Sequence, residues 1–172
     1  MENLTEKFKH EHLNFLRYYR LVIEFGAQKI LEILERHLQD AENKSFEEWL
    51  ADNKEAFYDR LKKPVRWVWN TLYPETCNME KASLDITVLK TIFVRLLDTF
   101  PEPQNGWDGH LDPNDHSEDA NILRIVKLRN GPHIAHNATC QLKQQHFEEK
   151  WRELDPGSER KISRLKVMQP LS

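Results

Sequence analysis

Apolar side chains recur along residues 13–38 at a spacing close to the 3.6 residues of an α-helical turn. Glu and Arg occupy many of the intervening positions, so this stretch predicts one long amphipathic helix that continues to about residue 38. The chain has only five glycines among its 172 residues, which leaves few positions for tight turns and favours helices elsewhere. We therefore predict an all-α helical bundle with one long N-terminal helix and several shorter helices. The predicted buried stripe of the long helix is Leu13, Leu16, Leu21, Phe25, Ile30, Leu34 and Leu38.

Side chains suited to capping mark the starts of later helices. Ser and Asp side chains accept hydrogen bonds from the free N–H groups of a helix's first turn. Breaks at Pro101 and at Gly131-Pro132 predict the ends of two of these helices. The three predicted caps are Ser45, which forms a capping-box pattern with Glu48, then Asp85, which opens a helix from Ile86 to Phe100, and Ser117.

Length and composition predict one folded domain over residues 1–155, followed by a flexible basic tail over residues 156–172. Hydrophobic residues make up 39% of the chain, and its five Trp and eight Phe require a buried core. No apolar run approaches the roughly 20 residues of a transmembrane helix, and the first residues lack the apolar segment of a signal peptide. Cys77 and Cys140 lie far apart in the sequence, as is typical of a reducing compartment. We expect a cytoplasmic protein with no membrane partner.

The charged and metal-binding residues exclude several classes of function. The formal net charge of −3 excludes a histone-like clamp for nucleic acid. No phosphate-binding glycine loop, paired-cysteine zinc motif or metalloprotease motif is present, so we expect neither a cofactor nor a bound metal. The acidic, His-containing segment 108–116 fits no standard ligand spacing and is better explained as a solvated loop with Asx turns. One local basic group could attract a phosphate backbone, although a solvated face is the simpler explanation: Arg60, Lys62, Lys63 and Arg66.

One cluster, residues 128–137, combines groups that suit phosphodiester chemistry. It contains a permanent cation, Arg129, an amide, Asn130, and two imidazoles, His133 and His136, around a predicted helix break. Arg holds phosphate through a planar fork of donors, and His titrates near neutral pH. Such groups can remove a 2′-hydroxyl proton and stabilise a charged phosphorus centre. From the residues alone a structural explanation is favoured, in which Arg129 pairs with an acidic neighbour and one His caps a helix end.

The cluster lies within an ordered series of landmark residues: Asp85, Ile86, Leu89, Leu96, Leu97, Pro103, Gly106, Trp107, Asp108, Pro113, Asp115, Ser117, Ala120, Ile122, Arg124, Ile125, Arg129, Asn130, His136, Phe147 and Trp151. With these landmarks the chain resembles the HEPN superfamily of helical nucleotide- and RNA-binding domains. The resemblance covers about residues 12–155, because earlier residues agree as well: Tyr18, Arg20, Leu21, Gly26, Leu31, Leu72, Tyr73 and Pro74. The superfamily motif is an Arg, usually followed by a polar residue, with a His a few positions further on. The resemblance is strongest to the branch found in a DAZ-interacting zinc-finger ubiquitin ligase and in NLR-like immune proteins.

The resemblance implies a HEPN-type bundle that forms a homodimer, with two Arg–His motifs facing each other across a composite cleft. It implies a metal-independent endoribonuclease in which Arg129 holds the scissile phosphate, Asn130 holds the loop and His136 acts as base or acid. The spacing from Arg to His is one residue longer here than in the branch pattern, so His133 remains an alternative imidazole. Arg124 and His133 are further candidates for contact with RNA.

Two other functions are compatible with the same resemblance. The domain could be a non-catalytic dimerisation or interaction module of a signalling or ubiquitin-ligase protein, or it could bind a nucleotide without cleaving RNA. The occurrence of this branch in immune proteins suggests a role in immune defence or stress response.

Overall fold

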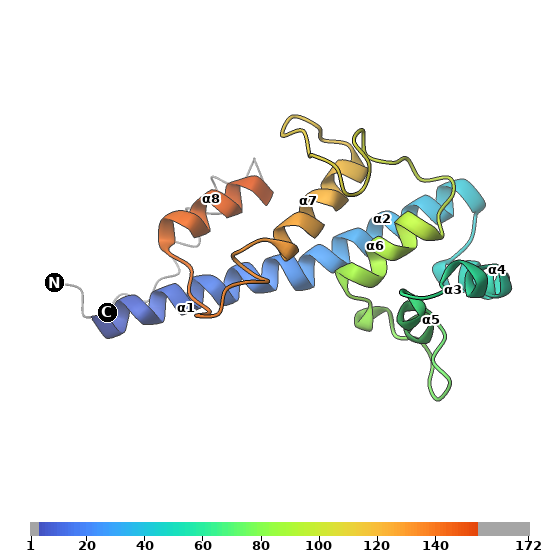
Figure 1. The fold of residues 1–172 in the computed structure, drawn as a ribbon, viewed down its shortest axis with the longest axis horizontal. Helices are drawn as coiled ribbons and strands as arrows, with labels where there is room; N and C mark the ends of the chain where they lie inside the picture. The colour runs from blue at the N-terminus through green and yellow to red at the C-terminus, as the bar shows by residue number, and fades with distance from the viewer. Residues whose placement is uncertain (1–3, 155–172) are drawn as a thin grey trace. The chain divides into compact units, whose positions relative to one another are not determined.

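The structure of the chain, a computed structural model, consists of helices joined by turns and loops over the residues that it describes, 4–154 (Figure 1). No β-strand occurs in this range, which confirms the all-α prediction. Over the same range, no helix combines the length and the apolar character needed to cross a membrane. The predicted tail over residues 156–172 lies outside the described residues. The helical segments are α1 (Leu4–Arg20), the π-helix η1 (Leu21–Phe25), α2 (Gly26–Glu42), α3 (Phe46–Asp52), α4 (Lys54–Arg60), α5 (Arg66–Leu72), the 3-10 turn η2 (Lys81–Ser83), α6 (Ile86–Arg95), α7 (Glu118–Asn130) and α8 (Gln144–Leu154).

Contacts divide the described chain into two compact units. The first unit joins residues 4–21 to residues 129–154, and the second unit spans residues 22–128. Both boundaries fall inside helical segments, one at the start of η1 and one just before the end of α7. Each unit has buried apolar residues of its own.

Helical residues cover the predicted N-terminal span, but they form three segments instead of one uniform α-helix. The π-helix η1 separates α1 from α2. The predicted buried stripe is correct within α2, where all three of its positions are fully buried: Ile30, Leu34 and Leu38.

The same stripe is wrong in α1 and η1. Leu16 and Phe25 are 60% and 53% exposed, and Leu13 is exposed as well. Phe15 and Tyr18 of α1 are buried instead. A π turn holds more residues than an α turn, so a stripe counted at a constant α-helical period falls out of phase across η1.

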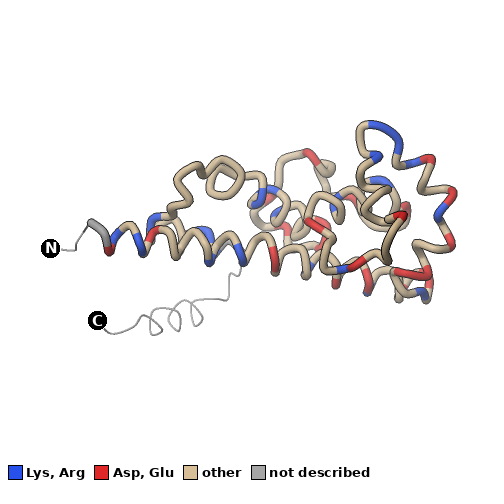
Figure 2. Tube along the Cα trace, turned by 90° about the horizontal axis from the view of Figure 1, so that it is seen from below, with Lys and Arg blue, Asp and Glu red and all other residues tan. Residues whose placement is uncertain are grey.

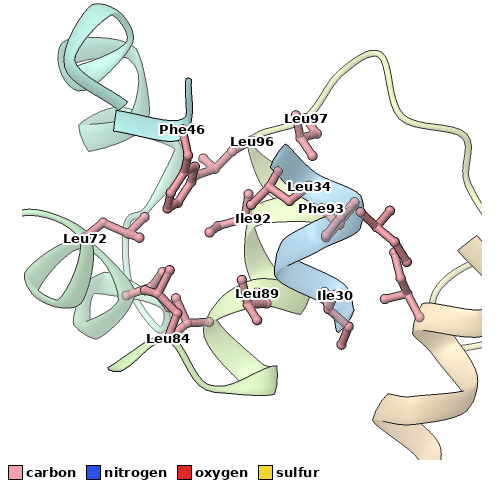
Figure 3. Close-up of a cluster of buried hydrophobic side chains, with 14 of the residues drawn as sticks. Ile30, Leu34, Phe46, Leu72, Leu84, Leu89, Ile92, Phe93, Leu96 and Leu97 are labelled. Carbon is pink, nitrogen blue, oxygen red and sulfur yellow. The ribbon is translucent and has the colours of Figure 1, made fainter. Parts of the chain in front are cut away.

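The core of the second unit lies where α6 packs against α2 (Figure 1). Leu89, Ile92 and Phe93 of α6 lie beside Ile30 and Leu34 of α2, and all five are buried (Figure 3). Three other segments complete this cluster through Phe46 of α3, Leu72 of α5 and Leu84 of the segment before α6.

The three predicted helix caps are confirmed. The Ser45 hydroxyl accepts a hydrogen bond from the Glu48 N–H at 3.2 Å, and the Glu48 carboxylate accepts one from the Ser45 N–H at 2.9 Å. Asp85 Oδ1 accepts two first-turn N–H groups at 2.8 Å each, which begins α6. Ser117 Oγ accepts one N–H of α7 at 3.3 Å. These caps satisfy donors that the helices themselves leave free.

The predicted end of α6 is wrong, because the helix ends at Arg95 and not at Phe100. The Leu97 N–H donates to the Ile92 carbonyl at 3.1 Å, a wider turn than the α-helical one. This turn leaves both Leu96 and Leu97 buried in the core. The helix therefore ends well before Pro101, and the two leucines that follow it lie in the core.

In the first unit, α8 packs along α1 (Figure 1). The buried apolar residues that the structure describes in this unit are Phe15 and Tyr18 of α1, Leu142 of the loop before α8 and Phe147 of α8. Trp151 is half-buried, and its ring centroid lies 5.5 Å from that of Phe147. These residues hold α8 and the loop before it in place.

Candidate functional site

Arg129 and Asn130 are the last two residues of α7 and belong to the first unit. The helix ends before Gly131-Pro132, as predicted, because a residue that precedes proline resists the helical conformation. Arg129 is half-buried, and its Nη1 donates to Asn130 Oδ1 at 2.8 Å. That bond uses one of the five N–H donors of a guanidinium group. Within residues 4–154 no carboxylate pairs with Arg129, so its predicted pairing with an acidic neighbour is not observed there.

Asn137 organises the loop that carries both candidate histidines. Its Nδ2 donates to the carbonyl oxygens of Gln141 and His133, at 2.7 and 3.4 Å. Its Oδ1 accepts hydrogen bonds from Thr139 Oγ1 at 3.1 Å and from the Gln141 N–H at 3.4 Å. One amide side chain therefore ties together the backbone on both sides of His136.

The C-terminal end of this loop is anchored on α1. The Leu142 N–H donates to the Glu11 carbonyl at 2.9 Å. At the start of α8, Gln144 Oε1 accepts a hydrogen bond from Asn14 Nδ2 at 2.9 Å, and Asn14 is only 5% exposed. A buried amide needs such a partner, so this bond fixes the position of α8 along α1. The loop is thus held at both ends, by α7 and by α1.

The two candidate histidines have different surroundings. His136 is exposed, and no described residue forms a hydrogen bond with its ring. His133 is half-buried, and its ring centroid lies 5.4 Å from that of His146 on α8. His136 is therefore the imidazole that is open to a ligand, whereas His133 packs against another imidazole.

Arg124, predicted as an RNA-binding residue, lies in the second unit. Its Nη1 donates to Asn121 Oδ1 at 2.5 Å, and its Nη2 donates to the Asp115 carbonyl at 2.9 Å. These bonds hold the loop before α7 against the first turns of that helix. A contact between Arg124 and RNA stays a prediction.

The acidic loop over residues 108–116 is explained by internal contacts. Asp108 pairs with Lys90 at 2.8 Å, and this hydrogen bond lowers the pKa of the Asp108 carboxyl. Asp112 and Asp115 each accept the N–H group two residues later at 2.9 Å, as in Asx turns. In the part of the chain that the structure describes, no three His, Cys, Asp or Glu side chains gather closely enough to hold a metal ion.

The fold and the position of the motif agree with a known family. The family model described as DZIP3/hRUL138-like HEPN matches residues 43–168, well over half of the chain. The chain belongs to this HEPN family. The matched range of the HEPN domain includes Arg129, Asn130 and His136. It begins just after α2, so the resemblance over residues 12–42 is not part of this match.

Two relatives of the HEPN domain are ubiquitin ligases by name. The E3 ubiquitin-protein ligase DZIP3 of Mus musculus is 26% identical over 126 residues, which is 71% of this chain and 10% of the ligase. The E3 ubiquitin-protein ligase DZIP3 of Homo sapiens is 30% identical over 77 residues, which is 44% of this chain and 6% of the ligase. The chain thus spans a tenth or less of the length of these relatives. No solved structure matches the chain.

Two residues at the candidate site of the HEPN domain were not predicted to have a role there. Asn137 follows His136 directly, and Asn often bonds to the backbone a few residues along in a turn, so a local signal was present. His146 lies on α8, and its contact with His133 depends on how α8 folds back on the loop. No local pattern in the sequence indicates that contact.

Proposed function

We propose that this HEPN domain binds RNA and cleaves it as a homodimer without a metal ion, with Arg129 and His136 as the catalytic residues. The observation that carries the proposal is that the end of α7 and the anchored loop directly after it carry the two groups. Arg129 uses one N–H donor in its hydrogen bond to Asn130, and His136 is exposed to solvent. Asn130 and Asn137 act as positioning residues, because their hydrogen bonds hold the helix end and the loop.

The reaction that suits these groups is transesterification at phosphorus. His136 removes the proton of the RNA 2′-hydroxyl while the O2′–P bond forms and the P–O5′ bond breaks. Arg129 stabilises the negative charge on the non-bridging phosphate oxygens. The 5′-oxygen leaves with a proton from the imidazolium of a second motif or from water. The products are a 2′,3′-cyclic phosphate and a 5′-hydroxyl end.

The proposal is tested by incubating the purified protein with EDTA and end-labelled single-stranded RNA. We expect Arg129→Ala and His136→Ala each to slow cleavage by about 10²-fold or more. Helicity and melting temperature should stay near the wild-type values, because neither side chain lies in a buried core. His133→Ala is the matched control and should retain most of the activity.

The double variant Arg129→Ala/His136→Ala decides the outcome. Cleavage that survives in the double variant at the wild-type rate would assign the activity to another site or to a contaminant. A loss of activity in His133→Ala, with His136→Ala active, would move the imidazole role to His133.

A second candidate function, a non-catalytic interaction module, is favoured by the exposed apolar face of α1. Phe8, Leu16 and Tyr19 fall on one face of this helix and are 49%, 60% and 42% exposed. Phe15 and Tyr18 are buried beside this face, and the Phe15 ring contacts that of Tyr19, with ring centroids 5.9 Å apart. A second copy of this chain fits such a face, because identical apolar faces are self-complementary across a two-fold axis.

Self-association through α1 is measured by size-exclusion chromatography with light scattering. We expect wild-type protein to be dimeric and Leu16→Glu to be monomeric, because a carboxylate in an apolar interface is costly to bury. Val94→Glu places the same charge on an exposed apolar position of α6 and should leave the dimer intact. A monomeric wild type would exclude the dimer, and a dimeric Leu16→Glu would place the interface elsewhere.

A further inference from the structure

Helices α4 and α5 of the second unit, with Tyr73 directly after α5, carry a row of aromatic and basic side chains that the proposed chemistry does not use. The ring centroids of Tyr58 and Trp69 lie 5.0 Å apart, and those of Trp69 and Tyr73 lie 4.1 Å apart. Arg66 Cζ lies 3.9 Å from the centroid of the Tyr58 ring, and Lys54 Nζ lies 5.6 Å from that of Tyr73. These five residues form an aromatic–basic strip with one cation at each end.

The segment that carries the strip is locally basic. Residues 54–66 contain five Lys or Arg and two acidic residues, a net charge of +3 in a chain with a net charge of −3. Lys and Arg gather where the chain passes from α4 to α5, at the right of Figure 2. Arg60 is neutralised by Asp98 at 2.8 Å, and Lys62 is paired with Asp59 at 3.2 Å. The remaining positive charge belongs to three residues.

Those three residues, Lys54, Lys63 and Arg66, have no carboxylate partner within residues 4–154. Lys63 is exposed in the short connection between α4 and α5. Arg66 Nη1 is buried and has no hydrogen-bond acceptor among the described residues. No carboxylate therefore offsets the charge of this guanidinium, which adds to the positive potential of the segment.

The aromatic part of the strip is both accessible and held in place. Tyr58 is 51% exposed, so its ring presents surface that a flat ligand can cover. At the other end, the Tyr73 hydroxyl donates to the Leu50 carbonyl at 2.7 Å, which fixes that ring against α3. Trp69 is half-buried between the two tyrosines. A row of fixed rings costs little conformational entropy when a ligand stacks on it.

We propose that the aromatic–basic strip, together with Lys63 in the connection before α5, is a binding surface for single-stranded RNA. Unpaired bases stack on aromatic rings and on Arg guanidinium planes, while Lys side chains contact the phosphates. A paired duplex hides its base faces, so the strip selects single strands. The inference rests on the proposed function only in taking RNA as the ligand. The strip belongs to a different compact unit from Arg129 and His136, so binding at the strip and cleavage at the motif are separable by mutation.

The test is fluorescence anisotropy with a labelled 2′-O-methyl RNA of about 12 nucleotides, a length within the range that single-strand binding folds occupy. This probe lacks the 2′-hydroxyl nucleophile, so wild-type protein binds it without cleaving it. We expect Lys63→Glu to weaken binding about fivefold. The slope of log binding constant against log salt concentration should become shallower by about 0.7, because one phosphate contact is lost. Lys29→Glu makes the same charge change at an exposed position of α2 and should leave the Kd within twofold.

Variants of Tyr58 form a second, independent test, because they change base stacking and leave the charge unchanged. Tyr58→Leu should weaken binding about tenfold, and Tyr58→Phe should restore it, since a phenyl ring stacks equally well. Thermal melts of each variant confirm that the fold is kept. The blunt duplex of the same sequence should bind more weakly than the single strand.

The outcomes separate this inference from the proposed nuclease. If Lys63→Glu and Tyr58→Leu both bound RNA with wild-type affinity, the proposed RNA-binding role of the strip would be wrong, whatever the cleavage assay shows. If Arg129→Ala lost RNA binding and the strip variants did not, the strip proposal would also be wrong. That result would support the Arg129–His136 motif as the RNA-binding site. Failure to bind any single strand, with strip variants that change only self-association, would assign the strip to a protein partner and refute the RNA proposal.

Discussion

Asn137 forms four hydrogen bonds inside the loop that carries His133 and His136. We expect Asn137→Ala to lower the free energy of unfolding by about 1–2 kcal/mol, because carbonyl and N–H groups of the loop lose their partner. Cleavage should slow as well, since the position of His136 depends on this turn. Urea unfolding and the RNA assay measure the two effects.

Asn137→Asp is the informative companion variant. It keeps the acceptor oxygen and removes the two bonds that Nδ2 donates to Gln141 and His133. Its stability should therefore fall between those of wild type and Asn137→Ala. Equal stability of all three proteins would show that the loop does not depend on this side chain.

Tyr73 gives the fold a dependence on alkaline pH. Burial raises the pKa of the Tyr73 hydroxyl to about 12, compared with about 10 for a tyrosine in an unfolded chain. The folded protein therefore holds this proton to higher pH than the unfolded protein does. Stability from the neutral phenol is complete below about pH 10 and is lost as the pH rises through about 12.

Tyr73→Phe removes both the titration and the hydrogen bond to the Leu50 carbonyl. We expect it to lower the free energy of unfolding by about 1 kcal/mol at neutral pH. The difference in free energy of unfolding between wild type and variant should then become smaller above about pH 10, because only the wild type has a phenol at this position that can ionise. Urea unfolding as a function of pH measures this gap, and a gap that stays constant into strong alkali would contradict the assignment.

At the scale of elements, the short helix α3 depends on its N-terminal cap. A helix of this length makes few internal hydrogen bonds, and the Ser45–Glu48 capping box satisfies two groups at its start. Ser45→Ala should lower the free energy of unfolding by about 1 kcal/mol, whereas Ser45→Asp should keep most of the stability. Chemical denaturation distinguishes the two variants. Equal loss in both would mean that packing of Phe46 and Trp49 alone holds α3.

The features that sequence reasoning predicted correctly are those set by neighbouring residues. The caps at Ser45, Asp85 and Ser117 depend on groups two or three residues away, and all three are present. The buried positions Ile30, Leu34 and Leu38 of α2 were also predicted correctly, because the apolar period of that helix is regular. Leu13 and Leu16 were wrongly predicted to be buried, because the π-helix η1 changes the helical period. No residue type in the sequence indicates a π turn.

The candidate site shows the same division between local and distant information. Arg129 and Asn130 were expected at a helix end before a Gly-Pro break, and that is where they lie. The anchoring of the loop by the Leu142 bond to Glu11 joins residues far apart in sequence, so no local pattern predicts it. The pairing of His133 with His146 has the same origin.

At the scale of the whole molecule, the two compact units differ in how they are stabilised. The second unit has an extended apolar core between α2, α6 and the short helices. The first unit, which contains the candidate catalytic residues, has few buried apolar side chains among residues 6–21 and 129–152: Phe15, Tyr18, Leu142 and Phe147. Regions with fewer buried apolar contacts open at lower free energy, so we expect the first unit to be the less stable of the two.

Hydrogen exchange on a pair of matched variants tests that expectation. Phe147→Leu and Phe93→Leu make the same change at buried positions of the first and second units, each at a cost of about 1 kcal/mol. Phe147→Leu should speed exchange in α1 and α8 and leave α2 and α6 protected, because their core does not contain Phe147. Phe93→Leu should speed exchange in α2 and α6. If either variant loosened every helix equally, the units would unfold together, and the Arg129–His136 loop would have no opening motion apart from global unfolding.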